Sequence, residues 1–284
     1  MNLKADQIEH EIQRMSSLSH TVPKIVQVVN DPSSSARDLV RVIQIDPVLT
    51  AKVLRIVNSA FYSVQQEVTS LNKAVIMVGM NTVKNLALST AVLNAFNFDE
   101  NQSGLTHEGF WMYSVGTAVL SKTLAQRGQL SGPESEDLFI VGLLHVIGKA
   151  FLLQFYPSQY RNIVEISQKE ELPTNTLEKK FFGVTHMEVG TILARNWKLP
   201  EVVRDGIENY IQPDHSEFTT TKYLSISSNA IKVNRIGFAG DYQAHLENDE
   251  ILRSICIDPL VLDDIISNQL NGDLEKANAF VKSK

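Results

Sequence analysis

The apolar residues of this chain recur at the spacing of an α-helix. In the N-terminal third, two stripes of apolar side chains, each on one helical face, are formed by Leu3, Ile8, Ile12 and Met15 and by Leu49, Val53, Ile56 and Val57. No strictly alternating apolar and polar stretch of useful length competes with them, and no repeat of solenoid length is visible. The pattern predicts an all-α fold.

Start and stop signals divide this pattern into separate helices. Asp46 followed by Pro47 is typical of an N-cap with proline at the first helical position. Thr185 and Glu188 have the spacing of a capping box. The predicted helices include segments 35–45, 47–57, 70–78, 81–96, 106–127, 133–155, 157–170, 185–197, 200–210 and 220–233.

A polar stretch at residues 94–106, which contains Gly104, separates two groups of predicted helices. We therefore expect two lobes, an N-terminal helical lobe over residues 1–103 and a larger lobe with a C-terminal extension over residues 104–284. The polar ends, residues 1–2 and 271–284, are expected to fray.

The charges are too evenly spread for a nucleic-acid binder. The chain has 26 basic and 32 acidic residues, a net charge of −6, and residues 1–103 hold 9 of each sign. Neither half has the basic surplus with which proteins neutralise phosphate backbones. We expect no nucleic-acid partner.

Compartment signals favour the cytoplasm. The single cysteine, Cys256, cannot form an internal disulfide, which suits a reducing compartment. The N-terminal stretch MNLKADQIEHEIQRM is charged throughout and lacks the apolar core of a secretory signal. The longest apolar runs, such as residues 74–80, are too short to cross a bilayer, so we expect no membrane partner.

His145 stands alone among apolar residues in the run GLLHVIG, with Gly142 and Gly148 three positions away on either side. A buried imidazole needs hydrogen-bond partners, because an unsatisfied polar group in such surroundings costs about 1–3 kcal/mol. Glycines at this spacing lie along one flank of a helix and indicate a close approach to it. The approaching group is either another helix, with His145 a satisfied core residue, or a ligand.

His186 follows the Thr185 cap at the first position of a predicted helix. The positive end of the helix dipole disfavours protonation there, so His186 is either a neutral imidazole able to ligate or accept a hydrogen bond, or a surface residue of the cap. The sequence has no GxxxxGK[ST], GxGxxG, HExxH or GxSxG motif that would favour another chemistry.

The order of several segments resembles the HDOD domain, an HD-related output domain of bacterial signalling proteins. The segments that carry the resemblance are DPVLTAKVLRIVNSAFY at 46–62, TSLNKAVIMVGMNTVKNLAL at 69–88, the aromatic run at 110–114, GLLHVIGK at 142–149, THMEVGTILARNWKLP at 185–200 and SNAIKVNRIG at 228–237. The first of these is the most specific. The resemblance covers roughly residues 15–240 and implies a degenerate HD-like helical domain packed on an N-terminal bundle.

Hydrolases of the HD superfamily bind a divalent metal through an early His, a His-Asp doublet and a later Asp, and the metal activates a water. The resemblance places Tyr113 where the early His is expected, His145 and Val146 at the doublet, and Asn229 near the later Asp. Asn209 and Tyr210 occupy a place where relatives often carry His, and His186 is retained. Most of the ligand set is missing. The candidates for a vestigial site or ligand pocket are Tyr113, His145, Val146, His186, Asn209 and Asn229.

The resemblance therefore implies a protein that signals by binding a partner protein, with no catalytic activity and no cofactor. The length leaves no room for an appended receiver, cyclase or DNA-binding domain, so we expect a stand-alone output protein. One alternative is a divergent metal-dependent HD-type phosphohydrolase, with His145 and His186 as remaining metal ligands. Another is a sensor that binds a nucleotide or similar ligand in the vestigial cleft.

Overall fold

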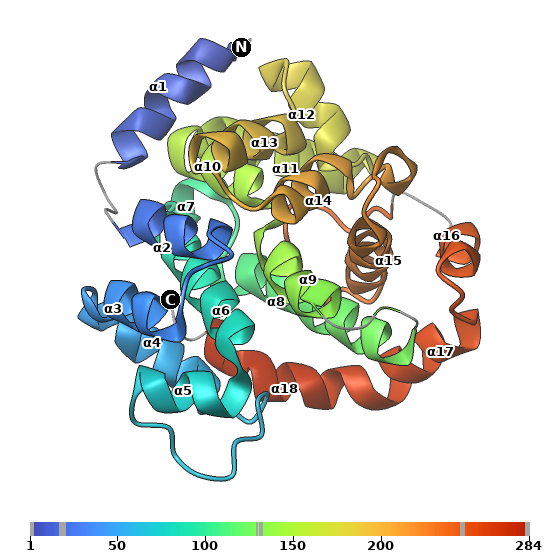
Figure 1. Cartoon of the computed structure of the whole chain (residues 1–284). Helices are drawn as coiled ribbons and strands as arrows, with labels where there is room; N and C mark the ends of the chain where they lie inside the picture. Colours follow the sequence, from blue (N-terminus) through green and yellow to red (C-terminus); the bar gives the residue numbers. More distant parts are fainter. Residues whose placement is uncertain (1–2, 17–20, 129, 131–132, 245–247, 282–284) are drawn as a thin grey trace.

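A computed structural model describes residues 3–16, 21–128, 130, 133–244 and 248–281, and these residues contain helices and no strand, as the periodicity predicts. Figure 1 shows the arrangement of the helices. In chain order they are α1 (Ala5–Ser16), α2 (Thr21–Asn30), α3 (Ala36–Gln44), α4 (Pro47–Val57), α5 (Leu71–Val78), α6 (Met80–Asn94), α7 (Glu100–Ser103), α8 (His107–Arg127), α9 (Pro133–Leu144), α10 (Ile147–Phe155), α11 (Pro157–Glu170), α12 (Thr174–Phe182), α13 (His186–Asn196), α14 (Glu201–Asn209), the 3-10 turn η1 (Pro213–His215), α15 (Thr219–Val233), α16 (Asn248–Ser254), α17 (Pro259–Asp264), the π-helical η2 (Ile265–Gln269) and α18 (Leu270–Val281).

The predicted caps are confirmed at the starts of α4 and α13. The Asp46 side chain accepts from the backbone N of Leu49 over 2.9 Å, with proline in the first turn. Thr185 and Glu188 form both hydrogen bonds of a capping box at α13. Each cap satisfies backbone donors that have no partner within the helix. The capping box fixes the position of His186 at the start of α13.

The prediction of one helix over residues 133–155 is wrong, because the chain leaves the helical conformation at His145 and Val146. Val146 has φ −107° and ψ 21°, and the His145 Nδ1–H donates to the carbonyl of Gly142 over 2.7 Å. The side chain thus satisfies a carbonyl that the ended helix leaves free. Apolar periodicity continues across the break and hides it from the sequence.

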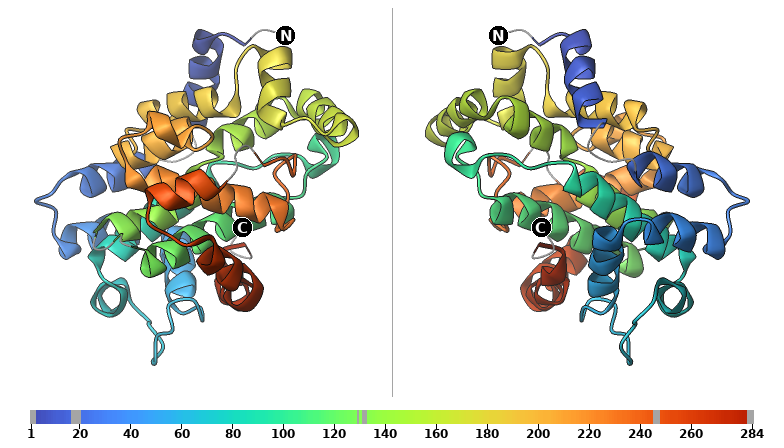
Figure 2. Two further views of the ribbon diagram at one scale, coloured as in Figure 1. Left: turned by 90° about the vertical axis from the view of Figure 1, so that its right-hand side faces the viewer. Right: turned by 90° about the vertical axis from the view of Figure 1, so that its left-hand side faces the viewer.

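The polar C-terminal stretch forms a helix as far as Val281, so the prediction that it frays is wrong for residues 271–281. Residues 1–2 and 282–284 lie outside the described residues. α18 buries Leu270, Leu274 and Ala277, which lie on one helical face. It packs against α8 and reaches α4, as Figures 1 and 2 show.

The long helix α8 lies at the centre of the larger group of helices and is covered by α9, α15 and α18. In the N-terminal group, α6 packs on both α2 and α4 and also on α9. The first helix lies elsewhere: α1 packs on α13, and the backbone N of Leu3 donates to the carbonyl of Phe182 over 2.7 Å. The first and last helices therefore both connect the two groups.

Among the described residues, only the segment Glu134–Phe155 is long and apolar enough to cross a bilayer, and 89% of its most apolar window is buried inside the protein. It comprises most of α9 and all of α10, which are packed among other helices. An apolar helix that is surrounded by protein is typical of a core. The same burial places the His145 turn in the interior.

Candidate functional site

Three of the six candidate residues meet in the interior of the larger group of helices. Tyr113 lies on α8, His145 lies in the α9–α10 turn, and His186 begins α13. The Tyr113 hydroxyl is 3.4 Å from His145 Nε2, and Tyr210 bridges the two histidines. Its ring centroid is 4.9 Å from that of His145, and its hydroxyl is 2.6 Å from His186 Nε2. All four side chains are buried.

These residues belong to a larger set of buried side chains that we call the buried polar cluster: Tyr113, His145, Lys149, Tyr160, Thr174, Glu178, His186, Tyr210, Ser228, Lys232 and Asp241. Its ionic half consists of Lys149, Thr174, Lys232 and Asp241. Its imidazole–tyrosine half consists of Tyr113, His145, Tyr210 and Ser228. Glu178, His186 and Tyr160 lie between the two halves.

His145 is a satisfied core histidine. It is fully buried, and its Nδ1 must carry the proton because the Gly142 carbonyl can only accept. Nε2 is then free to accept from the Tyr113 hydroxyl, whose oxygen is also 2.7 Å from the Ser228 hydroxyl. Burial lowers the pKa of His145 to about 3, so the imidazole is neutral in the folded protein at neutral pH.

His186 is buried as well, so the interpretation as a surface residue of the cap is wrong. Its Nδ1 lies 2.6 Å from Glu178 Oε2, and the same oxygen accepts from its backbone N over 2.7 Å. Burial raises the pKa of Glu178, but the neighbouring His186 and Lys149 outweigh this effect and bring it to about 2. Burial lowers the pKa of His186. The pair is therefore a neutral imidazole that donates to a carboxylate.

The ionic half was not anticipated from the sequence. Lys232 Nζ donates to Asp241 Oδ1 over 2.6 Å, and Lys149 Nζ lies 3.6 Å from Asp241 Oδ2. Lys149 also donates to the Thr174 hydroxyl over 2.8 Å and to the carbonyl of Ala239 over 2.9 Å. A signal was present for Lys149, because it stands in the otherwise apolar stretch IGKAFLL, where an unpaired charge is costly.

Electrostatics in the ionic half are dominated by the two ammonium groups. Burial acts to raise the pKa of Asp241, yet Lys232 and Lys149 hold it far below its usual value. Burial lowers the pKa of Lys232 to about 8, against the opposing effect of Asp241. With Glu178 also ionised, the cluster holds two cations and two anions, which explains how so many charges remain buried.

The other candidates contribute less to the cluster. Val146 is buried and ends the turn before α10, and it offers no donor atom. Asn209 is half-buried and donates to Asp205 over 2.8 Å, while the adjacent Tyr210 enters the cluster. Asn229 is buried on α15 directly after Ser228, whose hydroxyl lies 2.7 Å from the Tyr113 hydroxyl. Asn209 was expected in the vestigial site, but its side chain is bound to Asp205.

The glycines flanking His145 are explained by helix packing. A Cβ on Gly142 would lie 2.8 Å from the backbone N of Ala118 on α8. A Cβ on Gly148 would overlap the carbonyl oxygen of His186 and lie 2.7 Å from the backbone N of Gly190 on α13. Contacts this short do not occur with a real side chain. The group that approaches each glycine is thus a helix rather than a ligand.

The residues present do not fit the divalent metal that the HD superfamily implies. Each imidazole already uses both nitrogens in contacts with protein atoms, at Gly142 and Tyr113 for His145 and at Glu178 and Tyr210 for His186. Two ammonium groups lie in the same cluster and would repel a cation. Across the described residues, no group of three His, Cys, Asp or Glu side chains is placed to hold a metal ion.

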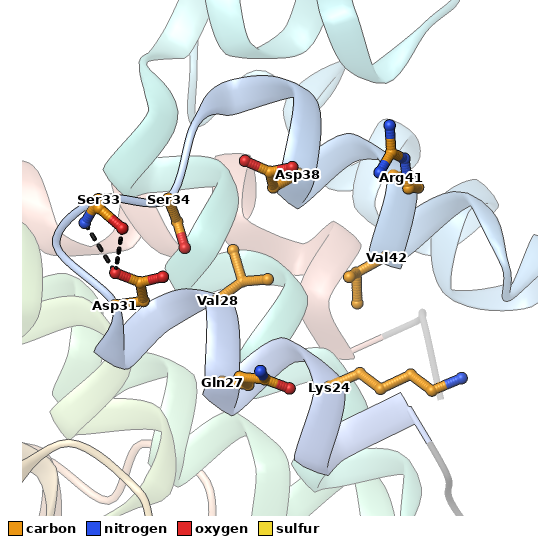
Figure 3. A pocket seen from close by; sticks show the side chains of 9 residues that line it. All are labelled: Lys24, Gln27, Val28, Asp31, Ser33, Ser34, Asp38, Arg41 and Val42. Atoms are coloured by element: carbon orange, nitrogen blue, oxygen red, sulfur yellow. Dashed lines mark hydrogen bonds between the residues drawn. The ribbon is translucent and has the colours of Figure 1, made fainter.

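The hollow in Figure 3 lies on the surface between α2 and α3, far from these contacts in the chain, and has a volume of about 330 Å³. Its carboxylates are engaged locally, because Asp31 accepts from Ser33 and Asp38 accepts from Ser35. Lys24 and Arg41 lie on its other side. The hydrogen bonds at Asp31 and Asp38 shape the α2–α3 turn and the start of α3, so the hollow needs no chemical role to explain its polar residues.

The fold is that of the HD class, an all-helical domain. The family model described as "HDOD domain" matches residues 15–213. The chain belongs to the HDOD domain family.

A curated relative of this chain is distant from it in sequence. An uncharacterized protein of Treponema pallidum is 25% identical over 214 residues, which are 75% of this chain and 40% of the relative. The chain therefore spans two fifths of the length of this curated relative.

Two crystal structures share the fold. A candidate phosphohydrolase from Shewanella amazonensis matches with a TM-score of 0.74 and 24% identity, over 96% of this chain and 97% of that one. A candidate signal-transduction protein from Marinobacter aquaeolei matches with a TM-score of 0.75 and 20% identity, over 94% of this chain and 59% of that one.

Proposed function

We propose that this chain is a non-catalytic HDOD module of bacterial signal transduction, located in the cytoplasm, that acts by binding a partner protein. The observation that carries the proposal is the buried polar cluster, in which both retained imidazoles are neutral and hydrogen-bonded within the protein. Hydrolysis by the HD mechanism needs an open coordination position for water. In the buried polar cluster, hydrogen bonds within the protein occupy the imidazole nitrogens that such a coordination site would use.

The name of the Marinobacter structure supports a signalling role, and the name of the Shewanella structure favours the enzyme alternative. Metal analysis of protein purified without chelator separates them. We expect a divalent metal content far below one per chain and no hydrolysis of p-nitrophenyl phosphate above the rate of a Lys149→Met variant. Stoichiometric iron, manganese or nickel that is lost in His145→Ala would establish the phosphohydrolase instead.

A partner needs an exposed surface, and the N-terminal helices offer apolar side chains for one. Of the described residues, the exposed large apolar ones are Ile45, Val48, Ile76, Met77, Val233 and Leu260, and the first four lie on or next to α3, α4 and α5. Val48 lines a shallow hollow of about 440 Å³ with Pro47, Ala51, Lys52 and Arg55. This strip of α4 combines apolar contact with two positive charges at its edge.

A charge placed on this strip tests the binding role. Val48→Asp should abolish co-purification of a partner from the native cytosol while leaving the unfolding transition of the protein in place. Leu260→Asp is the matched control, because Leu260 is equally apolar and 72% exposed but lies on α17. Capture that is unchanged by Val48→Asp, or lost equally in both variants, would remove α4 as the binding surface.

A further inference from the structure

Asp241 lies in a cradle of hydrogen-bond donors that resembles the binding site of a separate anion. Its Oδ1 accepts from Lys232 Nζ over 2.6 Å and from the backbone N of Gln243 over 3.1 Å. Its Oδ2 accepts from the backbone N and the hydroxyl of Thr174 over 3.1 and 2.5 Å. Lys149 completes the cradle at 3.6 Å. Four of these five donor groups come from Lys149, Thr174 and Lys232, which are distant from Asp241 in the chain or on another element.

Three helices supply four of the five donor groups of the cradle. Lys149 on α10 donates to Thr174 and to the carbonyl of Ala239, which lies in the same loop as Asp241. Thr174 begins α12, and Lys232 is in the last turn of α15. The backbone N of Thr174 is one of the donors that the first turn of a helix leaves free, and such donors favour anions. Both ammonium groups are at least 98% buried. An anion at this position is therefore required by charge, whatever its source.

The carboxylate is delivered by a loop and not by a helix. Residues 234–244 follow α15 without regular structure, and within them Ala239, Gly240 and Asp241 are buried. The backbone turns through Gly237 (φ +66°) and Gly240 (φ +107°), a conformation that glycine adopts at little cost. The loop is attached through the backbone N of Phe238, which donates to the Gly109 carbonyl over 2.7 Å. The remaining loop residues are half-buried or exposed, so the cradle is separated from solvent by this loop.

We propose that Lys149, Lys232 and the start of α12 form a binding site for a small oxyanion, a carboxylate or a phosphate group, which Asp241 occupies from within the chain. Displacement of residues 236–243 removes the backbone N of Gln243 and makes the remaining donors, on Lys149, Thr174 and Lys232, available to an external anion. The site follows from charge and hydrogen bonding alone, and it does not depend on whether the protein signals through a partner. It would give the HDOD module a chemical input in place of the lost metal.

Chemical rescue tests the site directly. In Asp241→Ala the cradle keeps both ammonium groups and loses its carboxylate. Formate, acetate and inorganic phosphate should therefore raise the Tm of Asp241→Ala by roughly 5 °C more than they raise the Tm of the wild type, with sodium chloride at equal ionic strength as the reference. A larger effect of formate and acetate indicates a carboxylate ligand, and a larger effect of phosphate indicates a phosphate ligand.

Asp205→Ala is the matched control. Asp205 also accepts three hydrogen bonds, but they come from Asn209, Ser216 and Thr221, and no ion pair joins it to a lysine or arginine among the described residues. Its removal should lower the Tm without rescue by any of the three anions. Equal rescue of both variants would show a general salt effect and overturn the proposal, as would the absence of rescue in a folded Asp241→Ala.

Hydrogen exchange of the wild type keeps the proposal testable if Asp241→Ala does not fold. Inorganic phosphate at matched ionic strength should increase the exchange of the backbone amides of residues 236–243 several-fold, because the anion competes with Asp241 and releases the loop. The amides of α8 serve as the internal reference and should not change. Identical exchange of the loop in phosphate and in chloride would then overturn the proposal.

Discussion

In the ionic half of the buried polar cluster, Lys232 donates to the Asp241 carboxylate over 2.6 Å, whereas in the imidazole–tyrosine half the Tyr113 hydroxyl meets the neutral His145 over 3.4 Å. Both halves are buried to the same extent. The first keeps its groups charged through close ion pairs, and the second keeps them neutral, with burial holding the pKa of His145 near 3. Removing one partner should therefore have very different consequences in the two halves.

The ionic half combines residues from separate parts of the chain. Lys149 and Thr174 lie inside the residues matched by the family model, 15–213, but Lys232 and Asp241 lie beyond them. Asp241, which compensates the charge of Lys149, is thus supplied by the C-terminal part of the chain. The ionic half is completed by segments that lie outside the family match.

Lys232→Met should have the largest effect on stability. Methionine keeps most of the apolar stem but leaves Asp241 with only the more distant Lys149, at 3.6 Å. Removing one partner of a buried ion pair costs about 3–5 kcal/mol, because the other charge stays buried. Urea unfolding followed by circular dichroism would measure the loss in the free energy of unfolding.

Lys276→Met is the control for that experiment. Lys276 forms an exposed ion pair with Asp273 over 3.0 Å on α18, and such pairs contribute at most about 1 kcal/mol. Equal losses in the two variants would mean that the ionic half is as solvated as the surface, and the contrast between the halves would fail.

Gly148→Ala should have the next largest effect, because Gly148 lies where α10 packs against α13. Gly148 directly precedes Lys149 on α10, and a methyl group added to it would overlap the carbonyl oxygen of His186 on α13. Overpacking of this kind costs about 1–3 kcal/mol and would separate α10 from α13. Gly272→Ala on α18 is the opposite case, since nothing lies within 4 Å of its Cβ, and it should gain about 0.5–1 kcal/mol. Thermal unfolding of the two variants should therefore shift in opposite directions.

Local signals in the sequence predicted most of the longer helices, because caps such as Asp46 and Thr185 act within a few residues. They also marked His145 and His186 as candidate site residues. The break after Leu144 was missed, since it depends on the side chain of His145 bonding back to Gly142. α12 and α18 were missed because they bury few side chains in polar stretches. The apolar surroundings of Lys149 were a signal that it is buried, but its partners could not be predicted, because they are set by tertiary packing and lie far along the chain.

The pH dependence of stability should report the neutral state of His145. Its pKa is about 3 when folded and about 6.5 when unfolded, so below pH 6.5 the unfolded chain binds a proton that the folded protein does not. The stabilisation is complete above pH 6.5 and is lost as the pH falls towards 3, at up to about 1.4 kcal/mol per pH unit. His145→Gln should reduce the slope between pH 6.5 and 4.5, and His186, whose pKa is also lowered by burial, should contribute to the slope that remains. Urea unfolding at pH 8, where both imidazoles are neutral, gives the pH-independent cost of the substitution. If the free energy of unfolding depends equally on pH in the wild type and in His145→Gln, His145 is protonated in the folded state as readily as in the unfolded chain.

Tyr113→Phe should have the smallest effect and completes the contrast. It removes a neutral hydroxyl that meets Ser228 at 2.7 Å and His145 at 3.4 Å, and the ring stays in place. The loss should be about 0.5–1.5 kcal/mol, since no charge is left unpaired. Tyr210→Phe is the informative partner, because the Tyr210 hydroxyl contacts His186, which in turn donates to the ionised Glu178. It should cost more than Tyr113→Phe, and equal costs in urea unfolding would mean that the carboxylate does not strengthen hydrogen bonds beyond the imidazole it contacts.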